Sequence, residues 1–108
     1  MTYTWTITKL ECKREENGLQ NVVFNCVYTR TVSHVYNNQT YTALISSNVF
    51  FRNPEPETFI QYQNLTKVII ENWLEDHLDV PSIDANLQST IENEINPSIV
   101  VLPLPFYT

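Results

Sequence analysis

In the first half of the chain, apolar and polar residues alternate, and two asparagine-containing dipeptides interrupt the alternation. Asn17-Gly18 and Asn37-Asn38 each stand between runs rich in Thr, Val, Tyr and Phe. Asn-Gly is a preferred two-residue turn of a β-hairpin because both positions accept a positive φ angle, and asparagine tolerates the same region. The pattern therefore predicts a three-stranded antiparallel β-meander over residues 1–51.

The two turns also fix which residues face each other, because side chains alternate between the faces of a sheet and a one-residue slip would exchange the faces. From the first turn, Trp5 is expected opposite Arg30, and Cys26 opposite Lys9. The second turn aligns the third strand with the second in the same way. The predicted apolar face consists of Trp5, Ile7, Val22, Phe24, Cys26, Tyr28, Tyr41, Ala43, Ile45, Val49 and Phe51.

The opposite face of the predicted sheet is polar and rich in threonine. It is either an ordinary solvated face or a flat surface that another subunit covers. Its residues are Thr2, Thr4, Thr6, Thr8, Asn25, Thr29, Thr31, Thr40, Thr42, Ser46 and Asn48, with Val23, Val27, Leu44 and Phe50 among them.

A linker and a helical pair are predicted in the second half. Pro54 and Pro56 disfavour regular structure, which makes residues 52–63 a linker. Helical spacing follows over residues 64–97, and Asn64 or Thr66 is expected to cap the first helix. The apolar stripe of that helix is Leu65, Val68, Ile69, Ile70, Trp73, Leu74 and Leu78, with Glu71, Glu75 and Asp76 on its wet side.

The second helix is expected to begin near Pro81-Ser82, with Ser82 as its cap. Asp84 would then lie in the first turn, where a negative charge suits the helix dipole. Asn96-Pro97 ends the helix. Packing of both helices on the apolar sheet face gives an α+β domain with two layers. The apolar residues of this helix are Ile83, Leu87, Ile91 and Ile95.

Residues 98–108 form an almost entirely apolar segment. Pro103 and Pro105 forbid a helix and hold the residues before them extended. We therefore expect an extended C-terminal arm. It either runs back over its own sheet or docks on a neighbouring subunit.

Composition and charge narrow the classes of function. A chain of 108 residues with 43% hydrophobic residues is a single globular domain by length and composition. A net charge of −6 makes nucleic-acid binding a poor hypothesis. Residues 1–5 do not resemble a signal peptide, and no apolar run suits a membrane span. Synthesis in a reducing cytosol is expected, with both cysteines as free thiols.

Residues that could carry chemistry are few. His34 and His77 lack metal-ligand spacing and are expected to be exposed structural histidines. In the predicted register Cys12 lies opposite Val23 and points away from Cys26, which excludes a disulfide between them. We predict no catalytic residue, no metal ligand, no cofactor and no small-molecule substrate.

Several short motifs resemble a family of small proteins from tailed phages, common in marine and cyanobacterial phages. The resemblance begins at residues 1–10 (MTYTWTITKL) and returns at 21–23 (NVV). It continues through 59–74, with FIQYQNLT leading into VIIENWL, and ends at 102–106 (LPLPF). The family usually ends in Leu-Pro-Trp, where this chain has Phe106, and often has a longer, glycine-containing second turn.

The resemblance implies a virion structural protein, which suggests a non-enzymatic assembly subunit such as a decoration, connector or tail accessory protein. Its partners would be other virion proteins or further copies of itself. The alternative is a small acidic phage protein that binds and inhibits or regulates a host factor. The residues predicted as core or interface positions are Trp5, Tyr28, Tyr41, Ile99, Val101, Leu104 and Phe106.

Overall fold

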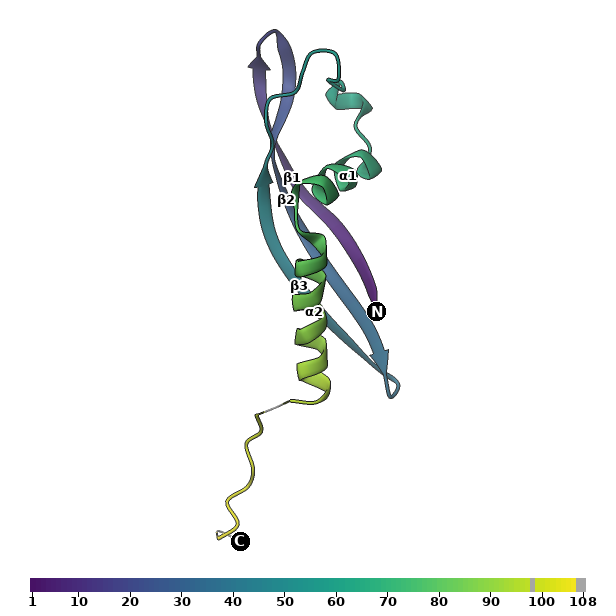
Figure 1. Cartoon of the computed structure of the whole chain (residues 1–108), viewed down its shortest axis with the longest axis vertical. Coiled ribbons are helices and arrows are strands. Elements are labelled where there is room, and N and C mark those ends of the chain that lie inside the picture. The colour runs from purple at the N-terminus through teal and green to yellow at the C-terminus, as the bar shows by residue number, and fades with distance from the viewer. Residues whose placement is uncertain (98, 107–108) are drawn as a thin grey trace.

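The computed structural model describes residues 1–97 and 99–106 and confirms the α+β class (Figure 1). Three antiparallel strands in the order β1-β2-β3 form one sheet, and two helices follow it. The elements are β1 (Thr2–Glu16), β2 (Leu19–Tyr36), β3 (Gln39–Phe50), the short 3-10 helix η1 (Tyr62–Asn64), α1 (Lys67–His77) and α2 (Val80–Ile95).

Both hairpin turns are where the sequence predicts them. The φ angles are 52° at Asn17, 82° at Gly18, 51° at Asn37 and 61° at Asn38. Two consecutive positive φ angles match the twist of the flanking strands and let two residues reverse the chain. The turns therefore join β1 to β2 and β2 to β3 directly, as predicted.

The register between β2 and β3 is continuous, whereas that between β1 and β2 shifts twice. Trp5 lies opposite Arg30, as predicted. Between Ile7 and Lys9 the pairing slips by one residue, so Cys26 lies opposite Leu10 and the predicted pairing with Lys9 is wrong. A second shift, between Glu11 and Cys12, restores the original register near the turn. Bulges of this kind insert an unpaired residue, and turn chemistry alone does not reveal them.

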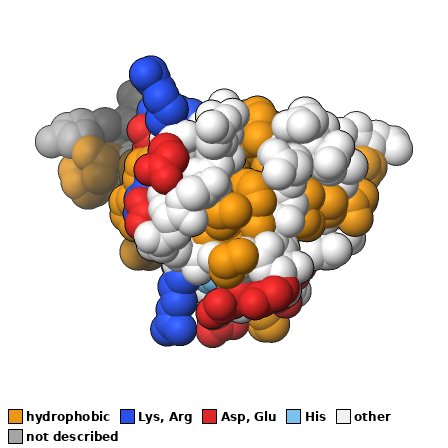
Figure 2. Space-filling view, turned by 90° about the horizontal axis from the view of Figure 1, so that it is seen from above, with side chains coloured by type: hydrophobic (Ala, Val, Ile, Leu, Met, Phe, Trp, Pro, Cys, Tyr) orange, Lys and Arg blue, Asp and Glu red, His pale blue; other side chains and the backbone are white. Residues whose placement is uncertain are grey.

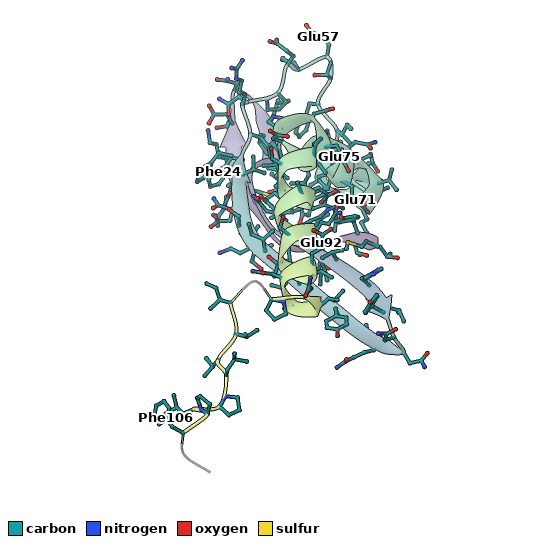
Figure 3. All side chains as sticks on the ribbon, turned by 60° about the horizontal axis from the view of Figure 1, so that its bottom comes forward. Phe24, Glu57, Glu71, Glu75, Glu92 and Phe106 are labelled. Atoms are coloured by element: carbon teal, nitrogen blue, oxygen red, sulfur yellow. The ribbon has the colours of Figure 1, made fainter. Side chains whose placement is uncertain are left out.

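The second shift moves Phe24 off the apolar face, which contradicts the prediction. Phe24 is the unpaired residue of β2 at this point, although its carbonyl still accepts a hydrogen bond from the Phe51 amide at 2.9 Å. Its ring stacks on Phe50 with 6.4 Å between the centroids. Phe50 is the neighbour of the core residue Val49 and so faces the other way. Figure 3 shows Phe24 on the side of the sheet away from α2.

The core lies between the sheet and the two helices, which cover the same face. Val68 was expected in this core and is instead 65% exposed, because only part of the α1 surface reaches the sheet. Full burial of an aliphatic side chain stabilises a fold by about 1.5–3 kcal/mol. The apolar side chains buried between the sheet and the two helices therefore hold both helices in place. One cluster contains Trp5, Cys26, Tyr28, Ile70, Leu74 and Val80, and the other contains Val32, Ala43, Leu87 and Ile91.

The helix ends are capped by side chains. The hydroxyl of Thr66 accepts a hydrogen bond from the Ile69 amide at 3.3 Å, so Thr66 is the cap of α1. α2 begins earlier than predicted, because Asp79 accepts hydrogen bonds from Ser82 and caps the helix. Ser82 is therefore not the cap. Asp84 lies beyond the first turn, and α2 ends at Ile95 as predicted.

The molecule is elongated, with extents of 74 × 25 × 19 Å. Residues 99–106 extend from the end of α2 away from the sheet (Figure 1). The extended arm is thus confirmed, and the alternative in which it runs back over its own sheet is wrong. Residues 98, 107 and 108 of the predicted arm lie outside the described residues. Within the described chain, no helix has the length and apolar character needed to cross a membrane.

The threonine-rich face carries short polar networks. Thr29 and Ser46 share a hydrogen bond of 2.7 Å across β2 and β3. The Asn48 amide donates to the Asn25 side-chain oxygen at 3.0 Å, and the Asn25 amide donates to Glu11 at 2.6 Å. The hydrogen bond from Asn25 is the main reason why the pKa of Glu11 is lowered. Cross-strand pairs of this kind stabilise the sheet through contacts within the chain itself.

Candidate functional site

A buried ion pair fixes α2 on the sheet. The Arg30 Nε and a terminal guanidinium nitrogen donate to the two carboxylate oxygens of Asp84, both at 3.0 Å. Only 9% of the Arg30 side chain and 22% of the Asp84 side chain are exposed. The hydrogen bond from Arg30 to Asp84 raises the pKa of Arg30, with burial acting in the opposite direction. This paired, planar geometry is the strong form of a charged hydrogen bond, and it holds sheet and helix in one alignment.

Aromatic rings complete the surroundings of Arg30. Its guanidinium carbon lies 4.4 Å from the centre of the Trp5 ring and 5.4 Å from that of Tyr3. Trp5 also donates from its indole nitrogen to Glu75 at 3.1 Å. Glu75 lies on the exposed side of α1, as predicted, and its hydrogen bond with Trp5 also links that helix to the sheet. The charges near Arg30 are therefore engaged within the fold and have a structural role.

The ion pair was not predicted from the sequence, although the position of Arg30 indicated that it needs a partner. The predicted register puts Arg30 on the apolar face, opposite Trp5. A charged residue at such a position needs a partner from the layer that covers it. Asp84, on the face of α2 next to Ile83 and Leu87, was the available carboxylate.

An open hollow of about 360 Å³ lies where the β1–β2 hairpin, the segment after β3 and α1 meet. Apolar side chains make most of its wall, with polar groups at a few positions. The lining residues are Asn21, Val22, Val23, Phe51, Arg52, Pro54, Thr58, Phe59, Ile60, Leu65, Trp73 and His77. Pockets that receive apolar groups have this composition: an apolar wall with a few polar groups that orient the ligand.

The floor of the hollow is a small group of rings. Phe51 contacts Trp73 edge to face, with 5.4 Å between ring centroids, and His77 with 4.9 Å. The His77 Nδ1 lies 2.8 Å from the Trp73 carbonyl oxygen. Such ring contacts add about 0.5–1.5 kcal/mol each beyond the area they bury. Three rings in mutual contact thus form one part of the wall of the hollow.

The arm is the second unusual surface. Ile99 is 87% exposed, Val101 98% and Leu102 72%. Figure 3 shows the arm projecting away from the sheet and helices, with Phe106 near its end. Contiguous apolar surface that is left to solvent is a mark of an interaction site.

The residues predicted as core or interface positions fall into two groups: some lie in or beside the core, and the others lie on the exposed arm. Trp5 and Tyr28 are buried in the core, and their rings meet edge to face at 5.4 Å. They are core residues and are closed to a partner. Tyr41 is half-buried beside the second cluster. Ile99, Val101, Leu104 and Phe106 all lie on the exposed arm.

Side chains with catalytic or metal-binding potential are dispersed. Within residues 1–97 and 99–106, no three His, Cys, Asp or Glu side chains gather as a metal site. His77 is exposed, as expected, whereas His34 is half-buried. Both cysteines are free thiols, and Cys26 lies in the core as predicted.

The fold and these surfaces define a small α+β domain with a three-stranded sheet, two helices on one face and an exposed apolar arm. A family described as "Domain of unknown function (DUF7936)" matches residues 1–106, and the chain belongs to this family. Neither a search of curated proteins nor a search of solved structures gave a match.

Proposed function

We propose that the chain is a non-enzymatic structural or assembly subunit of a tailed-phage virion that acts through protein–protein contacts. The sequence resemblance described above suggests the phage context. In this proposal the protein is made in the host cytoplasm and carried in the particle, and it binds other virion proteins or further copies of itself. It needs no cofactor, membrane or nucleic acid.

The exposed apolar arm is the observation that carries the proposal. Ile99, Val101 and Leu102 are outside the core, so the isolated domain gains little from them. Burial of each such side chain in a partner stabilises a complex by about 1.5–3 kcal/mol. Ordering the arm costs about 1–2 kcal/mol per residue, and its prolines reduce that cost by restricting the free arm. An arm of this kind suits assembly, where many weak contacts add up.

Quantitative mass spectrometry of purified particles tests the proposal. Particles of the phage that encodes this chain should contain it in a fixed ratio to the major capsid protein. A variant chain that ends after Asn96 should be expressed and folded but depleted from particles, because it lacks the arm. Val68→Glu, an exposed change on α1 outside the hollow, is the matched control and should be incorporated normally.

Two results would contradict the proposal. The chain could be abundant in infected cells and absent from particles, or the arm deletion could leave incorporation unchanged. Absence from particles together with a stoichiometric complex with one host protein would favour the alternative of an acidic inhibitor or regulator. The net charge of −6 would suit a basic host target.

A further inference from the structure

We infer that the arm of one copy binds in the hollow of a second copy, so that the chain associates head to tail. This inference rests on the proposed function, in which the arm is a contact element, and it names the partner. Two observations carry it. The arm and the hollow both present apolar side chains, and they lie at opposite ends of the molecule.

The positions of the two surfaces favour a contact between copies. The hollow lies near the β1–β2 hairpin, and the arm leaves from the far end of α2 (Figure 1). α2 has 16 residues, which corresponds to a length of about 24 Å. To reach its own hollow, the arm would have to reverse at Asn96-Pro97 and pass the whole helix. In the structure it extends in the opposite direction, away from the sheet (Figure 1).

The chemistry of the hollow suits the arm. Phe51, Phe59 and Trp73 line the hollow with partly exposed apolar side chains, and Ile60 at the rim is 36% exposed. Figure 2, seen from the end that carries the hollow, shows hydrophobic side chains between polar ones, with charged side chains toward the margin. Burial of the arm there would remove apolar surface from water on both sides of the contact.

The backbone of the arm suits burial as well. Pro103 and Pro105 have no amide hydrogen, so a buried Leu102–Phe106 segment has fewer donors that need a partner. Residues 99–106 carry no charged side chain. The contact therefore adds no repulsion of its own between two copies that each carry a net charge of −6.

A head-to-tail contact has a consequence for assembly. The two surfaces in contact are different, so each copy keeps one arm and one hollow available after it has joined a neighbour. Such heterologous contacts close into rings when the rotation between copies allows it, and otherwise form open chains.

Sedimentation velocity over a range of concentrations tests the inference with two variants. The first ends after Asn96 and lacks the arm. The second, Ile60→Glu, places a charge at the rim of the hollow. The parent chain should show a mass that rises with concentration. The arm-deleted chain should remain a monomer, and Ile60→Glu should self-associate only at concentrations roughly tenfold higher than the parent or more. Binding of the arm to Ile60→Glu should weaken roughly tenfold or more, which corresponds to about 1.4 kcal/mol.

Mixing the two variants gives the decisive measurement. The arm-deleted chain keeps its hollow, and Ile60→Glu keeps its arm. The mixture should form heterodimers and nothing larger, because the heterodimer has no second competent contact. A labelled peptide of residues 97–108 should bind the arm-deleted chain by fluorescence anisotropy and should bind its Ile60→Glu form at least about tenfold more weakly. Val68→Glu is the matched control and should self-associate like the parent, and circular dichroism should show every variant folded.

The inference is overturned if the parent chain stays monomeric at all concentrations, or if Ile60→Glu and Val68→Glu self-associate equally. Its failure is distinct from failure of the proposed function. A chain that is stoichiometric in particles but never self-associates would retain the virion role and lose the second copy as partner. A chain that self-associates through arm and hollow but is absent from particles would do the reverse.

Discussion

Arg30 shows, at the scale of single residues, how a charge can be accommodated in a small core. The guanidinium makes two hydrogen bonds of 3.0 Å to Asp84 and lies 4.4 Å from the centre of the Trp5 ring. Removal of one member of a buried pair leaves the other charge without compensation, which costs more than removal of both. The pair therefore fixes the alignment of α2 on β2.

Asp84→Ala should lower the free energy of unfolding by about 3 kcal/mol, because it leaves Arg30 buried and unpaired. Urea unfolding followed by circular dichroism measures this loss. In the double variant Arg30→Met with Asp84→Ala, part of the stability should return, since no charge is then left in the core. Arg30→Met alone completes the cycle. If the losses in the two single variants added up to the loss in the double variant, Arg30 and Asp84 would not be coupled, and the pair would not be what fixes α2 on the sheet.

The two cysteines offer an internal comparison of burial. Burial raises the pKa of both thiols. Cys26 is fully buried in the core, whereas Cys12 is half-buried on β1. Because the thiolate is the reactive form and a raised pKa reduces its share near pH 8, both should react slowly.

In the native protein, Cys12 should react with a thiol reagent before Cys26 does. Cys26 should become reactive only in denaturant, since its sulfur is closed to the reagent until the core opens. Labelling at pH 8 followed by peptide mass spectrometry distinguishes the two sites, and Cys12→Ser isolates the slower one. Rapid native labelling of Cys26 would show that this core opens easily.

At the scale of elements, the start of α2 depends on Asp79, whereas Ser82 was predicted as the cap. Asp79 accepts from the Ser82 amide at 3.2 Å and from the Ser82 hydroxyl at 2.9 Å. Pro81 then occupies the first turn, where its missing amide hydrogen costs nothing. The helix starts at Val80, which places Asp84 beyond the first turn and within reach of Arg30.

Asp79→Ala should lower the free energy of unfolding by about 1 kcal/mol, the usual cost of a lost helix cap. Ser82→Ala should cost less, because the Ser82 amide can still donate to Asp79. Thermal or urea unfolding of the two variants measures the difference. A larger effect at Ser82 than at Asp79 would mean that the helix begins later than Val80.

The strands show which parts of an element the sequence could predict. Asn37-Asn38 fixes the register of β2 and β3 along their whole paired length, and that register is confirmed. The register that Asn17-Gly18 predicts for β1 and β2 holds in two parts of β1. One part is next to the turn, from Cys12 to Glu16, and the other runs from Thr2 to Ile7. Between these regions Thr8 and Phe24 are unpaired in opposite strands. Two compensating bulges leave no mark in a simple alternation, so the side of Phe24 could not be predicted.

At the scale of the whole molecule, the shape is the main departure from an ordinary small domain. The radius of gyration is 20.1 Å, whereas a compact domain of this length would have about 13 Å. Long strands and the projecting arm account for the difference (Figure 1). Such a shape exposes much surface for contacts relative to its core.

A chain that ends after Asn96 should unfold with a free energy within about 0.5 kcal/mol of that of the parent, because surface changes away from the core have small effects. Its sedimentation at low concentration should indicate a more compact particle. Urea unfolding and sedimentation velocity measure the two quantities. A large loss of stability would show that the arm belongs to the core of its own domain, and the assembly role of the arm would then be untenable.

The sequence by itself determined the meander, the helical pair and the extended arm. These depend on local rules: asparagine accepts positive φ, apolar spacing selects a helix, and proline at 103 and 105 excludes one. Only the tertiary structure decided the bulges, the Arg30–Asp84 pair, the hollow at Phe51 and Trp73, and the direction of the arm. Each of these depends on residues far apart in the chain, and the free energy of packing them together has no signature in any short stretch of sequence.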